Sequence, residues 1–228
     1  MNDPKKKLSR MDLVGPALLL ALSAIPMLGG AMRLTSLSAP VSEENARFVA
    51  SPAPVVLHIA SAALYALLGA FQFSPGIRRR FPTWHRRAGK VLVAAGLLTG
   101  LTGLWMAQIY AIPVGMQGPF LHGTRLLVGT GMIASLLLGW SAILRRDIPR
   151  HEAWMIRAYA LAQGAGTQVL VLMPWTIATG ESTGLTRDLL MTLAWAINLV
   201  VAEWLIRRRR APGSRFAAQS SVTSAPSA

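Results

Sequence analysis

Four histidines are the residues whose type and spacing in this chain best suit chemistry. They are His58, His85, His122 and His151, and each lies near the start of a different long apolar stretch. A neutral imidazole nitrogen binds iron, and a pair of them from facing helices can hold a haem from both sides. Because such ligation asks little else of a sequence, the pattern predicts a b-type haem site.

The same histidines permit other interpretations. Histidine stays hydrated where a membrane meets water, and His85 is followed by Arg86 and Arg87, while His151 lies between Arg150 and Glu152. These charges hold both rings close to the water. Four interfacial histidines without a cofactor, or a metal or proton site, therefore remain open beside haem.

Six apolar stretches must position these histidines. The chain has 228 residues, of which 53% are hydrophobic and 14% charged, and polar segments separate the apolar blocks. Roughly 20 apolar residues cross a bilayer as a helix. The composition thus predicts an all-α, six-helix transmembrane bundle, with spans at Leu13–Met32, Pro54–Phe73, Val91–Ile112, Leu121–Leu144, Trp154–Ile177 and Leu189–Ile206.

The basic residues orient the bundle. Most of the 23 Lys and Arg residues lie before the first span, between spans two and three, between spans four and five, and after span six. Short loops rich in Lys and Arg stay in the cytoplasm. This alternation predicts an even number of spans, both termini in the cytoplasm, and a multi-pass membrane protein. It also explains the net charge of +14 by the lipid bilayer, so that no nucleic-acid partner is expected.

This topology sorts the histidines into two layers on a central four-helix core formed by spans two to five. His58 and His122 are expected in the outer leaflet, and His85 and His151 at the inner face. Arg125, one turn into span four on the outer side, suits a haem propionate because its planar fork matches a carboxylate, and it equally suits a lipid headgroup. Glycines at helical spacing in spans three and four indicate close helix packing or room for a flat cofactor.

The remaining features set limits. The chain has no cysteine, which excludes disulfides and Cys-ligated zinc or iron–sulfur sites. The first apolar run lacks a convincing cleavage site, so we expect an uncleaved first span. Residues 1–210 are predicted to form a single transmembrane domain, and residues 211–228, which are poor in large apolar residues, a disordered cytoplasmic tail.

Three strings of the sequence carry a family resemblance. LLGAFQFSPGIRRRFPTWHRRAGK (67–90), RRDIPRHEAWMIRAYALAQGAGTQ (145–168) and WAINLVVAEWLIRRR (195–209) resemble an uncharacterised family of bacterial integral membrane proteins known by a domain-of-unknown-function label. The resemblance covers most of residues 10–210. It implies an integral membrane protein, multi-pass and located in the bacterial inner membrane, and adds no reaction.

A weaker resemblance concerns architecture alone. The ascorbate-reducible di-haem cytochromes b also have six spans, with one ligating histidine on each of spans two to five. The resemblance implies that His58 and His122 ligate an outer haem, and His85 and His151 an inner one. This chain lacks a recognisable ascorbate-site motif, which leaves the reductant undetermined.

We therefore predict a transmembrane oxidoreductase that binds one or two haems b through paired histidines and passes electrons from an unknown donor to an unknown acceptor. The alternatives are a transporter, in which Arg125, the glutamines and the histidines line a polar path, and an accessory or assembly factor. An electron carrier needs a chromophore, a transporter needs a polar path across the membrane, and an accessory or assembly factor needs neither.

Overall fold

Long apolar helices account for nearly all of the structure. The computed structural model describes residues 8–210, which form nine α-helices and one short 3₁₀ turn, η1 (Ser36–Ser38), and contain no strand. Five of the helices are long and apolar enough to cross a membrane. This confirms the all-α membrane class. The five are α1 (Arg10–Thr35), α3 (Pro52–Gln72), α5 (Pro82–Ile109), α6 (Pro119–Leu144) and α9 (Gly184–Arg210).

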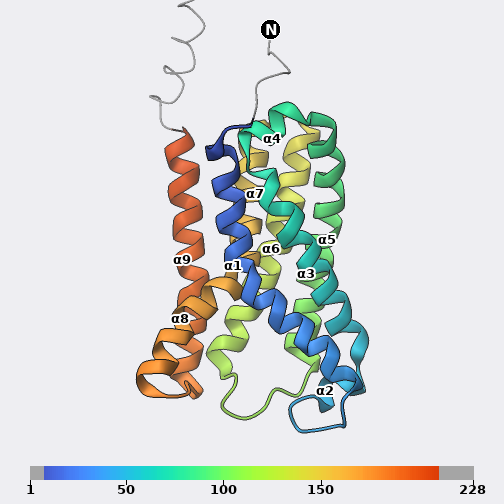
Figure 1. Cartoon of the computed structure of the whole chain (residues 1–228), viewed down its shortest axis with the longest axis vertical. Coiled ribbons are helices and arrows are strands. Elements are labelled where there is room, and N and C mark those ends of the chain that lie inside the picture. Colours follow the sequence, from blue (N-terminus) through green and yellow to red (C-terminus); the bar gives the residue numbers. More distant parts are fainter. Residues whose placement is uncertain (1–7, 211–228) are drawn as a thin grey trace, which may run out of the picture.

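The stretch expected as a continuous fifth span is divided into two helices. α7 (Ile148–Ala162) ends at Gln163, and α8 (Gly164–Thr179) starts immediately after it, so that each is shorter than a bilayer crossing. In Figure 1, α7 runs from the α4 end to the middle of the bundle, where α8 turns outward. The Gly184 amide donates to the Gly115 carbonyl at 3.0 Å, so α8 ends beside the loop before α6. The two helices together therefore run the length of the bundle.

Side chains of α9 satisfy the backbone groups that this break releases. The Asn198 amide nitrogen donates to the Ala160 carbonyl at 3.1 Å, and the Trp195 indole N–H to the Leu161 carbonyl at 3.2 Å. Unpaired backbone groups are costly at membrane depth, so an interrupted helix is tolerated only where neighbours supply partners. Asn198 and Trp195 of α9 therefore stabilise the end of α7.

α1 bends at its middle, as Figure 1 shows, and Pro26 explains the bend. A proline has no N–H to give the carbonyl four residues earlier, and its ring pushes against that turn. The carbonyl concerned is that of Leu22, and Gly166 of α8 packs against it: a Cβ at Gly166 would lie 2.2 Å from the Leu22 oxygen. Glycine therefore permits the close approach of α1 and α8.

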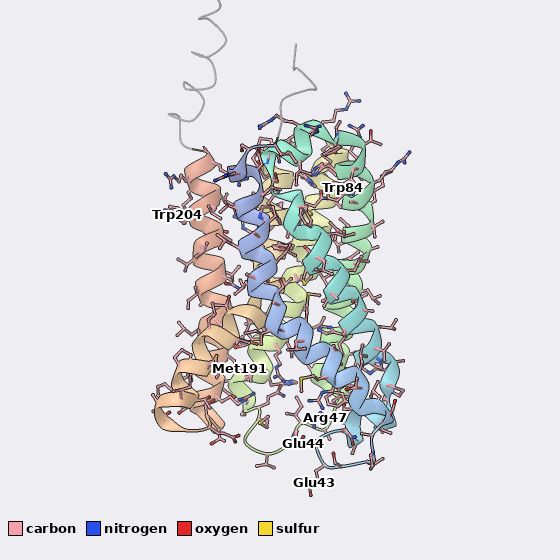
Figure 2. The ribbon with its side chains drawn as sticks, viewed as in Figure 1. Glu43, Glu44, Arg47, Trp84, Met191 and Trp204 are labelled. Carbon is pink, nitrogen blue, oxygen red and sulfur yellow. The ribbon has the colours of Figure 1, made fainter. Side chains whose placement is uncertain are left out.

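The two ends of the bundle differ in charge. Figure 1 shows that both ends of the described chain lie at one end, together with α4 (Pro75–Arg80), whereas α2 (Ala46–Ala50) lies at the other. Figure 2 places Trp84 and Trp204 towards the first end and Glu43 and Glu44 at the second. At the first end, Glu152 of α7 pairs with Arg209 and lies 3.8 Å from Arg78. Ion pairs thus join α4, α7 and α9 there.

A core of aromatic and aliphatic side chains holds the central helices together. Tyr65, Leu136 and Tyr159 are buried in it, and the Tyr159 hydroxyl donates to the Ala66 carbonyl at 2.8 Å. Gly96 of α5 packs against this core, because a Cβ there would lie 2.8 Å from atoms of Tyr65 and Leu136. Small residues that admit close neighbours are what helix association in lipid requires. The tail predicted for residues 211–228 lies outside the described residues.

Candidate functional site

A cavity of about 440 Å³ lies between the central helices, in the half of the bundle away from the chain ends. This size falls in the range of small-molecule and cofactor sites. Most of its wall is apolar, and three arginines, one histidine and two glutamines also line it. Its most relevant lining residues are Arg47, His58, Gly100, Gly103, Met106, Arg125, Gly129, Met132, Gln163, Gln168, Arg187, Met191 and Trp195.

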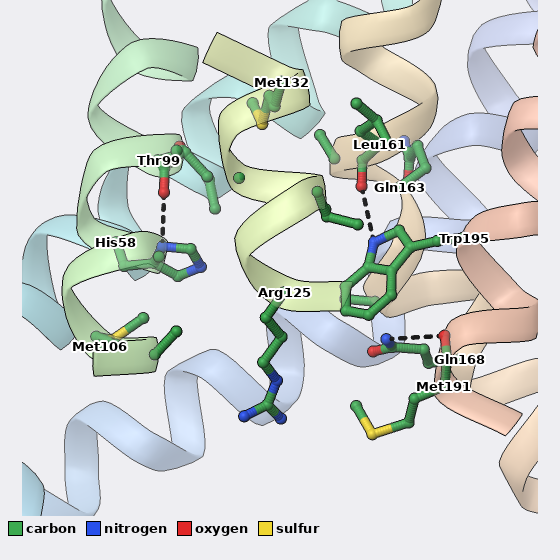
Figure 3. Close-up of a pocket in the computed structure, with 18 of the residues that line it drawn as sticks. His58, Thr99, Met106, Arg125, Met132, Leu161, Gln163, Gln168, Met191 and Trp195 are labelled. Atoms are coloured by element: carbon green, nitrogen blue, oxygen red, sulfur yellow. Dashed lines mark hydrogen bonds between the residues drawn. The ribbon is translucent and has the colours of Figure 1, made fainter. Parts of the chain in front are cut away.

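His58 of α3 presents a defined face to this cavity. Its Nδ1 lies 3.1 Å from the Thr99 carbonyl oxygen and 3.1 Å from the Thr102 hydroxyl. A carbonyl only accepts hydrogen bonds, so Nδ1 carries the proton and the lone pair resides on Nε2. Figure 3 shows Nε2 directed into the cavity. This tautomer, fixed by a backbone acceptor, is the arrangement that metal-ligating histidines usually have.

Glycines allow the helices to approach closely beside the imidazole. A Cβ on Gly103 would lie 3.4 Å from Cε1 of His58, and Gly100 and Gly129 line the same cavity from α5 and α6. Of the two meanings open for these glycines, Gly100 and Gly129 also serve close packing, because a Cβ at each would meet Ile133 and Leu104 side-chain atoms respectively. The helices that form the cavity wall near His58 are therefore tightly packed.

Three guanidinium groups from distant parts of the chain line the cavity. Arg47 comes from α2, Arg125 from α6 and Arg187 from the first turns of α9. Arg125 donates to the Gln117 side-chain oxygen. Burial, followed by the nearby Arg33, lowers the pKa of Arg47. This lowered pKa means that the surroundings of Arg47 disfavour its positive charge. An anion bound beside Arg47 would therefore stabilise the charged form.

One buried carboxylate organises this end of the bundle. Asp188 is 1% exposed and accepts hydrogen bonds from the Gly118 amide at 3.0 Å and from the Leu121 amide at 3.0 Å. It therefore caps the N-terminus of α6 from the neighbouring α9, where a negative charge also suits the helix dipole. The same carboxylate is the negative charge that acts on the nearby Arg125.

The other three predicted ligands do not line the cavity. His122 lies in the first turn of α6, with Nδ1 3.3 Å from the Gln117 amide nitrogen. At the opposite end, the Nδ1 of His151 lies 2.9 Å from the Gly139 carbonyl, and the Nδ1 of His85 is buried with no hydrogen-bond partner among the described residues. Within residues 8–210, no three His, Cys, Asp or Glu side chains gather into a metal site. Their pairing as haem ligands stays a prediction.

Some lining residues carry no signal that sequence reasoning used. Arg47 and Arg187 resemble ordinary loop arginines, and only the folded chain brings them beside Arg125. Gln163 is one of the glutamines that the transporter alternative placed along a polar path, and it also marks the break between α7 and α8. The Gln-Gly-Ala-Gly sequence at 163–166 is the one local hint, because two glycines within an apolar run weaken a helix.

Comparisons with known proteins agree with this architecture. The model of a family described as "Predicted membrane protein (DUF2306)" matches residues 55–206, well over half of the chain. No curated protein and no solved structure matches the chain. The matched residues include α3, α5, α6, α7 and α8 almost completely and hence most of the cavity wall. The chain thus belongs to the predicted membrane proteins of the DUF2306 family, with several apolar helices suited to repeated crossings of a bilayer.

Proposed function

We propose that this protein binds b-type haem in the cavity, with His58 as an iron ligand, and carries electrons within the bacterial inner membrane. The observation that supports this most is the His58 ring. Its Nδ1 is held by the Thr99 carbonyl, and its Nε2 faces an apolar cavity lined by three arginines. When bound, the haem supplies a reversible one-electron centre.

The cavity suits the two chemically different edges of a haem. The macrocycle is apolar, which matches the mostly apolar lining of the cavity, including Met106, Met132 and Met191. Two propionates are anionic, and the guanidinium groups of Arg47, Arg125 and Arg187 are available to bind them. The predicted role of Arg125 towards a propionate is therefore part of the proposal.

The proposal includes six membrane crossings with both chain ends in the cytoplasm. α7 and α8 would then cross together as one interrupted span. Support comes from the common position of the two chain ends in Figure 1 and from the basic residues of α4 at the same end. Loops rich in Lys and Arg favour the cytoplasmic side.

A difference spectrum tests the haem. The full chain is expressed with ample haem supply and purified in detergent, and its dithionite-reduced spectrum is compared with its air-oxidised one. We expect sharp α and Soret bands that His58→Ala removes, because this change takes away the nitrogen that faces the cavity. A featureless spectrum from monodisperse wild-type protein would show that haem is not the ligand.

The remaining predicted ligands are resolved by the same measurement. Loss of the bands in His122→Ala would support the pairing of His58 with His122. A fall to about half the absorbance in His85→Ala and in His151→Ala would support a second, inner haem. Bands unchanged in all three variants would leave a single haem whose histidine is His58.

A different chemical class has one observation in its favour. The α7–α8 break and the Pro26 bend of α1 place two interrupted apolar helices in contact, a feature of transporter binding sites. A transporter of an amphipathic organic anion would use the three arginines without any chromophore. Uptake of such an anion into vesicles by a colourless protein would favour this function over electron transfer.

A further inference from the structure

The turn that joins α6 to α7 carries an arginine in an unusual backbone conformation. Arg146 has a φ of 61°, and among the described residues it is the one non-glycine residue with a positive φ. The Asp147 amide donates to the Ala142 carbonyl at 2.9 Å, and the Arg146 amide to the Ile143 carbonyl at 3.0 Å. These two bonds form a Schellman motif, whose left-handed position is usually occupied by glycine. The chain therefore accepts a steric cost to keep an arginine there.

Basic side chains gather around this turn without acidic partners. The two acidic residues closest to it in the sequence are already engaged: Asp147 caps α7 by accepting from the Arg150 amide at 3.1 Å, and Glu152 pairs with Arg209. Within residues 8–210, no carboxylate forms an ion pair with five exposed arginines at this end of the bundle, namely Arg86 and Arg87 at the start of α5, and Arg145, Arg146 and Arg150 in or beside the turn. The surface at the turn thus attracts an anion.

Apolar side chains flank the same arginines. Leu144 is 69% exposed and Ile148 is 53% exposed, and they precede and follow Arg145 and Arg146 in the chain. Exposed apolar residues beside basic ones are typical of segments at a membrane surface, where the apolar groups enter the acyl boundary and the basic groups meet anionic headgroups. An acidic soluble protein would satisfy the arginines but would not require the two apolar side chains. The combination favours a lipid.

We propose that the α6–α7 basic turn, defined as residues 144–150, binds the headgroup of an anionic phospholipid. Its arginines hold the phosphate, because a guanidinium fork matches phosphate oxygens, and Leu144 and Ile148 contact the acyl chains. Membrane orientation needs only positive charge at this end, at any backbone position. A strained position such as that of Arg146 is retained where a particular contact depends on it. The turn lies outside the cavity, so this binding does not depend on haem.

Lipid titration of a single glycine variant provides the test. The full, delipidated chain in detergent is titrated with phosphatidylglycerol or with phosphatidylcholine of the same acyl chains, and bound lipid is measured by native mass spectrometry. We expect wild type to prefer phosphatidylglycerol, and Arg146→Gly to bind it about fivefold more weakly, the scale of one basic residue at an anionic surface. Glycine adopts a positive φ without steric cost, so the variant should unfold at or above the wild-type temperature. Its weaker binding then does not come from unfolding.

The matched control is Arg207→Gln, which removes the same charge from an exposed position of α9 at the same end of the bundle. This variant should bind phosphatidylglycerol like wild type. Equal weakening in both variants would mean that net charge alone attracts the lipid, and equal binding of the two lipids by wild type would mean that the headgroup is not recognised. Either result overturns the proposal.

A competition experiment separates a lipid from a free anion. Inorganic phosphate in large excess should leave phosphatidylglycerol bound to wild type, because it offers nothing to Leu144 and Ile148. Full displacement of the lipid by phosphate would overturn the assignment to a phospholipid. Binding in His58→Ala should equal that of wild type, so a failure of the haem proposal leaves this result intact.

Discussion

Asp188 shows how one buried side chain can fix the positions of helices at the arginine-lined end of the cavity. The carboxylate comes from α9 but satisfies amides at the start of α6, the helix that carries Arg125. Capping from a different element fixes where α6 begins relative to α9. The position of Arg125 in the cavity wall therefore depends on a side chain that touches no ligand.

Removal of that cap should destabilise the protein. Asp188→Ala leaves the Gly118 and Leu121 amides buried without their acceptor, and we expect the free energy of unfolding to fall by about 2 kcal/mol. The measurement is SDS-induced unfolding followed by circular dichroism. Glu181→Ala, at an exposed acidic residue of the neighbouring loop, is the control and should change stability little. Equal effects of both changes would contradict the capping role.

Residue type alone anticipated part of the site. Histidine and arginine are rare in apolar helices and functional when present, which is why His58 and Arg125 were candidates. Asp188 escaped notice because an acidic residue beside a loop is ordinarily solvated. Its burial depends on the meeting of residues 118 and 188, and no local pattern encodes that contact.

The contact between α1 and α8 illustrates the element scale. Pro26 bends α1 and releases the Leu22 carbonyl, and Gly166 brings α8 against it. Pro26 and Gly166, which are 140 residues apart in the sequence, thus form one contact between α1 and α8, here called the α1–α8 joint. The same joint carries the hydrogen bond from Ser23 to Gln163.

A methyl group added at Gly166 should disturb the α1–α8 joint. Gly166→Ala would place a Cβ 2.2 Å from the Leu22 oxygen, so the helices must separate, and we expect a loss of about 1–3 kcal/mol in the free energy of unfolding. Gly29→Ala is the matched control, because nothing lies within 4 Å of a Cβ there. In the helix α1 this change should be neutral or stabilising by up to about 1 kcal/mol. Similar unfolding curves for Gly166→Ala and wild type would refute close packing.

The helices themselves were largely predictable, and the break was not. Apolar length located five of the helices that can cross a bilayer, because transfer into lipid depends on composition alone. Apolar length gave no sign that the run at 154–177 divides at Gln163, and the two glycines at 164 and 166 are only a weak local hint. The division is stable because Asn198 and Trp195 of α9 bind the freed carbonyls. A prediction made from the residues of one segment alone does not include the hydrogen-bond donors that another segment provides.

The membrane topology, with six crossings, is a prediction about the whole molecule. The chain has no cysteine, so single cysteines report their location without background. We expect a membrane-impermeant maleimide to label Val114→Cys and Glu181→Cys in intact cells, and Arg145→Cys only after permeabilisation. All three positions are exposed. Labelling of Glu181→Cys together with Arg145→Cys would mean that α7 and α8 do not cross the membrane.

The wide separation between the chain ends and the arginine-lined cavity bears on how the protein matures. The chain ends lie at the α4 end of the bundle, and Arg47 lies at the other. If the chain ends lie in the cytoplasm, as proposed above, then the cavity lies in the half of the membrane away from the cytoplasm. Whatever fills the cavity must then be delivered after the helices have been inserted, from the far compartment or from the lipid. A ligand made in the cytoplasm would therefore have to cross the membrane or enter the cavity sideways from the lipid before the protein is complete.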